Sequence, residues 1–65
     1  MKHLRKACEI AGSQRALAAM LGVTEQAVGL WFLRGVPKKR LVAVERATGG
    51  KVKASDLWAE KRGAA

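Results

Sequence analysis

The stretch QRALAAMLGVTEQAVGLW, residues 14–31, places a single glycine between two runs that have the apolar spacing of short helices. Gly22 can take the left-handed conformation that ends a helix, and the hydroxyl of Thr24 can cap the start of the next one. Two short helices that cross at a wide angle through a tight glycine-containing turn form a helix-turn-helix unit. We therefore predict one helix over residues 14–21 and a second that begins at its cap, Thr24, and runs to Leu33.

The same periodicity extends through the rest of the chain and predicts an all-α fold of four or five short helices. A first helix is expected over residues 2–11, followed by Ser13 as the cap of the next helix. Pro37 is expected in the first turn of a fourth helix, which the glycine pair at residues 49–50 ends. The side chains expected in the core are Leu4, Ala7, Cys8, Ala11, Leu17, Met20, Leu21, Ala27, Val28, Trp31, Leu41, Val44, Ala47, Val52 and Leu57.

The C-terminal part of the chain has weaker signals. The segment KVKAS, residues 51–55, can form a short edge strand, and Ser55 can cap one more helical turn. Residues 59–65 are expected to form a flexible tail, since terminal segments without apolar anchors fray. The predicted helix-turn-helix domain therefore comprises residues 1–58.

Composition and charge restrict the classes of function. Thirteen Lys and Arg residues against five acidic residues give a net charge of +8, which favours a polyanionic partner such as nucleic acid or an anionic surface. The alternative interpretation is that this charge only maintains solubility. The longest apolar run, ALAAMLGV, is far shorter than the roughly 20 residues that span a bilayer, so no membrane association is expected. The single cysteine, Cys8, excludes an intramolecular disulfide and a cysteine-rich metal site.

Two segments carry a resemblance to a known group of proteins. CEIAGSQRALAAMLGVTEQAV, residues 8–28, and VPKKRLVAVERATGGKVKASDL, residues 36–57, resemble the small Cro-like and YdaS-like antitoxin group of bacterial and prophage regulators, which has the lambda repressor-like fold. The resemblance covers the chain from about Leu4 to Leu57. It implies a single-domain transcriptional repressor that binds a palindromic operator in double-stranded DNA as a homodimer. Such a protein is expected in the bacterial cytoplasm, associated with the nucleoid.

The resemblance also implies roles for individual residues. It places Thr24, Glu25, Gln26, Gly29 and Leu30 toward the DNA bases, and Gln14 and Arg15 toward phosphates. Gln26 has the chemistry to pair with adenine, Glu25 to accept from cytosine, and Leu30 to contact a thymine methyl group. Four cations follow the second helix of the predicted helix-turn-helix unit and can hold the DNA backbone; they are Arg34, Lys38, Lys39 and Arg40. Gly29 and Leu30 replace the polar residues common in the group, so either the backbone approaches DNA closely there or few bases are read.

Other interpretations of these residues remain open at this stage. Trp31 has the register of a core residue, whereas Phe32 and Trp58 are candidates for a dimer interface. His3 is expected at the surface without a partner, and no metal site, cofactor site or catalytic grouping is visible, so an enzyme is not expected. The same fold can instead serve as an antitoxin or another module that binds a toxin or regulatory protein. Non-specific binding to nucleic acid or to an anionic membrane through charge alone is a third hypothesis.

Overall fold

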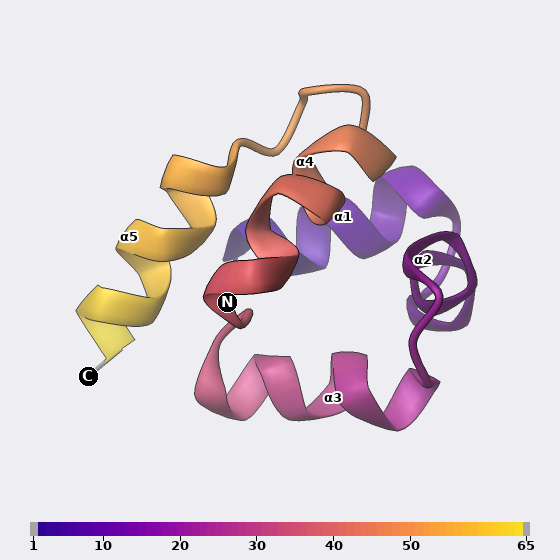
Figure 1. Cartoon of the computed structure of the whole chain (residues 1–65), viewed down its shortest axis with the longest axis horizontal. Coiled ribbons are helices and arrows are strands. Elements are labelled where there is room, and N and C mark those ends of the chain that lie inside the picture. Colours follow the sequence, from indigo (N-terminus) through magenta and orange to yellow (C-terminus); the bar gives the residue numbers. More distant parts are fainter. Residues whose placement is uncertain (1, 65) are drawn as a thin grey trace.

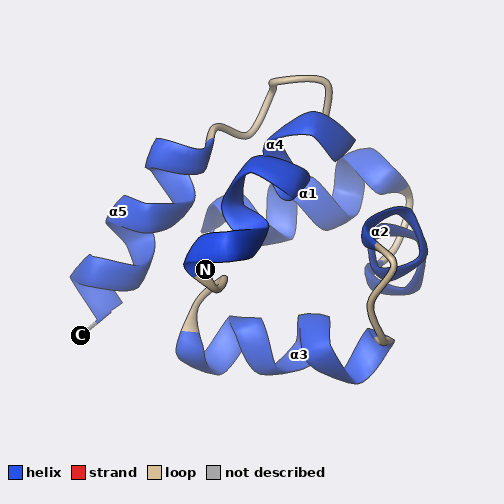
Figure 2. Cartoon of the chain, in the orientation of Figure 1, coloured by secondary structure: helices blue, strands red, loops and turns tan. Residues whose placement is uncertain are grey.

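The computed structural model describes the backbone of residues 2–64 and the side chains of residues 2–59. Its elements are α1 (Lys2–Ala11), α2 (Gln14–Leu21), α3 (Glu25–Arg34), the 3₁₀ turn η1 (Lys38–Arg40), α4 (Leu41–Ala47) and α5 (Ala54–Ala64) (Figure 1). Residues 2–64 contain helices and loops and no strand, which confirms the predicted all-α fold (Figure 2).

The turn between α2 and α3 has the conformation predicted from its residues. Gly22 has φ 70° and ψ 30°, and the N–H of Val23 donates to the carbonyl of Ala18 at 3.0 Å. This pattern of bonds ends α2 as a glycine C-cap. Thr24 then accepts from the N–H of Ala27 at 3.1 Å and caps α3. The axes of α2 and α3 are bent by 105°, so the predicted wide crossing is confirmed.

The predicted core is correct at most positions. The buried apolar residues are Leu4, Ala7, Cys8, Leu17, Ala18, Val28, Trp31, Val36, Leu41, Val44, Val52 and Leu57, and Ala11, Leu21 and Ala47 pack partly against them. The expectation for Met20 was wrong, because its side chain is 56% exposed. At 100° per residue, Met20 lies about 100° from the centre of the face formed by Leu17, Ala18 and Leu21. It therefore lies at the edge of the buried stripe of α2.

The start of the fourth helix also differs from the prediction. Pro37 has φ −59°, which suits a helix, but its ψ of 146° is extended. One 3₁₀ turn follows, in which the N–H of Arg40 donates to the carbonyl of Pro37 at 2.8 Å, and α4 begins only at Leu41. The extended conformation accompanies full burial of Val36, a core residue that helical periodicity did not identify.

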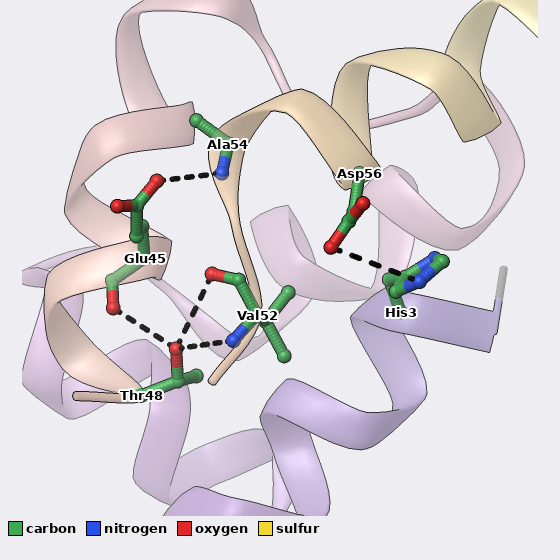
Figure 3. Close-up of polar contacts among 6 residues, drawn as sticks. All are labelled: His3, Glu45, Thr48, Val52, Ala54 and Asp56. Carbon is green, nitrogen blue, oxygen red and sulfur yellow. Dashed lines mark hydrogen bonds and ion pairs between the residues drawn. The ribbon is translucent and has the colours of Figure 1, made fainter. Parts of the chain in front are cut away.

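The segment between α4 and α5 is attached by the side chains of Glu45, in α4, and of Thr48, the C-cap of that helix. The hydroxyl of Thr48 donates to the carbonyl of Glu45 at 2.9 Å and accepts from the N–H of Val52 at 3.1 Å (Figure 3). The carboxylate of Glu45 accepts from the N–H of Ala54 at 2.7 Å. The predicted strand at residues 51–55 is therefore wrong, because these backbone groups bond to α4 and not to another strand.

Two further expectations, for Ser55 and for His3, were wrong at helix α5. It begins at Ala54, so Ser55 lies within its first turn and is not its cap. His3 is not isolated, because its Nε2 lies 4.0 Å from Oδ2 of Asp56, which joins α1 to α5 (Figure 3). The predicted domain boundary at residue 58 falls inside α5, and the side chains from residue 60 onward lie outside the described part. The flexible tail thus stays a prediction.

Candidate nucleic-acid interface

Helix α3 has one face in the core and the opposite face in solvent. Val28 and Trp31 are buried and fix its orientation. Gln26, Leu30 and Leu33 lie within about 60° of one another on the opposite face, as 100° per residue requires, and all three are exposed. Figure 1 shows α3 along one edge of the fold, where a rod of this kind is accessible to a partner.

The predicted contact residues divide by exposure. The exposed ones are Arg15, Thr24, Glu25, Gln26, Leu30, Arg34, Lys38, Lys39 and Trp58, and the half-buried ones are Gln14, Gly29, Phe32 and Arg40. The oxygen of Thr24 is engaged as the cap of α3, but its hydroxyl proton can still be donated. Phe32 packs partly against the core, whereas Trp58 is 37% exposed. Their role in a dimer stays a prediction.

Gln14 has a contact that the sequence did not indicate. Its Nε2 donates to the carbonyl of Glu25 at 3.3 Å and so joins the first residue of α2 to the first turn of α3. A Cβ at Gly29 would lie 3.2 Å from the same Nε2. Gln14 therefore packs closely against Gly29, a contact that was not among the two alternatives drawn from the sequence for this glycine.

We expect Gly29→Ala to stabilise the fold by about 0.5 kcal/mol. Alanine is favoured over glycine in a helix by roughly 1 kcal/mol. Displacing the flexible end of Gln14 from an exposed bond offsets about half of that. Urea unfolding followed by tryptophan fluorescence measures the difference.

The matched control for this substitution is Gln14→Ala combined with Gly29→Ala. Because the contact is then absent, alanine at position 29 should gain its full helix-forming benefit over the Gln14→Ala single variant. If the single Gly29→Ala variant loses more than about 1 kcal/mol of unfolding free energy, the prediction is wrong, and the side chain of Gln14 at the start of α2 cannot move aside.

Cations lie at both ends of α3. Arg15 is in the first turn of α2, next to the residue that contacts the start of α3. Arg34 is in the last turn of α3, and η1, which contains Lys38, Lys39 and Arg40, follows after the three residues 35–37. Positive charge at the two ends of an exposed helix matches the two phosphate backbones that border a groove of duplex DNA.

Leu33 is the surface residue that the sequence analysis missed. Its side chain is 82% exposed, more than any other large apolar side chain in the described part of the chain. It lies one turn after Leu30, which is also exposed. The spacing of Gln26, Leu30 and Leu33 was a usable signal, because all three share the face opposite to Val28.

The described residues also bear on three other features: a reactive thiol, a metal site and a membrane-spanning helix. Burial raises the pKa of the Cys8 thiol, and the neighbouring Glu9 adds to this effect, so the thiol remains neutral and unreactive near neutral pH. No group of three His, Cys, Asp or Glu residues in the described part is placed to hold a metal ion. No single described helix is long and apolar enough to cross a membrane; α2 and α3 pass that test together, as a pair bent by 105°.

A family model described as "Bacterial toxin YdaS" matches residues 4–61. The chain belongs to the YdaS family. A relative in this family, "Putative transcriptional regulator YdaS" of Escherichia coli (strain K12), is 40% identical over 55 residues. This match covers 82% of the chain but 56% of the relative, so the chain spans little more than half of that protein's length.

A solved structure has the same architecture as this YdaS-family chain. It is the "Cro protein from putative prophage element Xfaso 1 in Xylella fastidiosa strain Ann-1", with a TM-score of 0.87 and 38% sequence identity. The match covers 92% of the chain and 94% of the Cro protein. The resemblance to Cro-like and YdaS-like regulators, and the fold that it implies, are therefore confirmed.

Proposed function

We propose that this YdaS-family chain is a DNA-binding transcriptional repressor of the Cro type, not an enzyme, which binds a palindromic operator as a homodimer in the bacterial cytoplasm. The observation that carries the proposal is the exposed face of α3, held at 105° to α2 and bordered by cations at both ends. In such an arrangement the second helix enters the major groove while the first crosses the DNA backbone. The names of the E. coli relative and of the Xylella Cro protein support the same assignment.

The test is selection of bound sites from random double-stranded DNA by the purified chain. A palindromic consensus, with half-sites about one helical turn apart, is the expected result for a dimer. Competition with scrambled DNA then measures the specificity at physiological salt. A pool without any consensus would reject sequence-specific binding and leave charge-driven, non-specific binding as the explanation.

Gln26 is the residue from which we expect the clearest base discrimination. Its side chain is exposed at the N-terminal end of α3, where the amide can form two hydrogen bonds with adenine. Gln26→Ala should cost about 1–3 kcal/mol on the selected operator and relax the preference at one base pair per half-site. Binding to an operator set in which each base pair is changed in turn measures both effects.

Glu25→Gln is the control for that experiment, since it changes the adjacent exposed side chain. If Glu25 accepts from cytosine, the two variants should relax different base pairs. A uniform loss of affinity over all operators in the Gln26→Ala variant would contradict a base contact.

One observation favours a second function, that of an antitoxin or other protein-binding module. Leu30 and Leu33 form an exposed apolar pair on α3, and apolar residues that project from a surface are common in protein interfaces. Replacing thymine by uracil in the operator removes the methyl groups that these leucines would contact on DNA. If Leu33→Ala and the uracil operator each leave affinity unchanged, the pair is available to a protein partner.

A further inference from the structure

A groove with a volume of about 440 Å³ lies between α2 and α4. Its lining residues are Met20, Leu21, Val42, Ala43, Arg46 and Ala47. Two of the large apolar side chains in it, Met20 and Val42, are 56% and 54% exposed. A single exposed apolar side chain is common on protein surfaces. Met20 and Val42, however, come from two neighbouring helices and line the same groove.

The floor of the groove is continuous with the protein core. Leu21 and Ala47 line it and also pack against the buried cluster. An apolar side chain placed in the groove would therefore contact ordered atoms on several sides and leave water, which is the usual basis of an anchoring contact. The groove has the properties of a small binding site.

The groove lies away from the face proposed to meet DNA. Its walls come from α2 and α4, and none of the exposed residues of α3 lines it. In Figure 1, α3 lies along the lower edge of the fold, and α4 lies above it. An occupant of the groove can therefore bind while α3 remains accessible.

Charge indicates what kind of occupant fits. Arg46 is the charged member of the six lining residues, and it is exposed. The carboxylate of the adjacent Glu45 is engaged with the N–H of Ala54 and faces α5. The rim is therefore positive, and an acidic partner would be attracted to it.

A second copy of the chain is a poor occupant by the same reasoning. It would bring a net charge of +8 toward Arg46. Stable dimers also bury about 800 Å² on each partner, and a groove of about 440 Å³ supplies only part of such a surface. A groove lined by apolar side chains of two helices is the kind of surface that receives the apolar face of one amphipathic helix, with anchors at i, i+3 or i+4 and i+7.

We propose that the groove between α2 and α4 binds one amphipathic helix of a protein partner, with apolar anchors beside Met20 and Val42 and Asp or Glu residues beside Arg46. None of the six residues that line this groove is among the proposed DNA contacts. The groove gives the chain a second interaction surface, through which a regulatory protein can bind away from the exposed face of α3.

The test uses a displayed library of helix-forming peptides with leucines fixed at i, i+4 and i+7 and the flanking positions randomised among Glu, Lys and Ala. Selection against the full chain is expected to enrich Glu at the flanks. The enriched peptide should bind at least tenfold more weakly to the Met20→Gln, Val42→Thr double variant. Arg46→Glu should reverse the preference and enrich Lys.

Leu33→Gln is the matched control, because it replaces an exposed leucine outside the groove and should leave peptide binding unchanged. A pool with no charge preference, or peptide binding that survives the double variant, would overturn the proposal. So would sedimentation showing that the groove variants abolish self-association, since the occupant would then be a second copy. Operator affinity of the Met20→Gln, Val42→Thr double variant should not change, so failure here is distinct from failure of the DNA-binding function.

Discussion

Leu17→Ala is expected to lower the free energy of unfolding by about 2–5 kcal/mol, which is most of the stability of a chain this small. Leu17 is fully buried on α2, the helix that contacts α1, α3 and α4. Its loss would leave a cavity where these helices meet, and eight-residue α2 has little room to move and fill it. Urea unfolding, followed by circular dichroism and by tryptophan fluorescence, measures the change.

Met20→Ala is the matched control on the same helix. Its side chain is 56% exposed, so the change should cost less than about 1 kcal/mol. An equal loss in the two variants would contradict the orientation of α2 in the structure. Because α2 positions α3, Leu17→Ala should also abolish DNA binding under conditions in which Met20→Ala keeps it.

Removing the three cations of η1 is expected to produce the largest loss of DNA affinity. Each phosphate contact contributes a slope of about 0.9 in the logarithm of affinity against the logarithm of salt concentration. If Lys38, Lys39 and Arg40 each contact a phosphate, replacing all three by alanine should lower the slope by about 2.7. If the variant and the parent chain bind equally at 1 M salt, this difference in slope lowers the affinity of the variant roughly 500-fold at 0.1 M salt. Titration of labelled operator at several salt concentrations gives both values.

The control removes the same number of charges from another helix. Lys2, Arg5 and Lys6 are exposed on α1, which packs against α2, α4 and α5. Replacing these three by alanine should change the slope by less than one phosphate contact. Equal losses in the two triple variants would mean that only net charge matters, and would favour non-specific binding over the proposed orientation on DNA.

Local chemistry explains why so much of the fold could be predicted. Ser13 and Thr24 each accept a hydrogen bond from the amide three residues later, as cap residues do in any context. Gly22 takes the left-handed conformation at the predicted break. These devices act within a few residues, so their positions in the chain were enough to predict where α2 and α3 begin and end.

The candidate interface could be predicted only in part. The resemblance to Cro-like regulators implied that Gln26 and Leu30 face away from the core, and both are exposed. Leu33 shares their face but was missed, because the resemblance implied no role for it and it lies at the predicted end of the helix. The contact of Gln14 with Glu25 joins residues eleven apart, and no local pattern identifies such a pair.

The amino-acid sequence by itself determined the all-α class, the helix breaks and the bend between α2 and α3, because caps, glycines and 3.6-residue periodicity act locally. Only the tertiary structure decided that Met20 is exposed, that Val36 is buried and that Glu45 and Thr48 hold the segment before α5. The physical reason is that burial and long-range hydrogen bonds depend on which helices meet, and a helix of seven or eight residues has several faces that could serve. Packing selects one of these faces, and it also leaves the groove between α2 and α4 open.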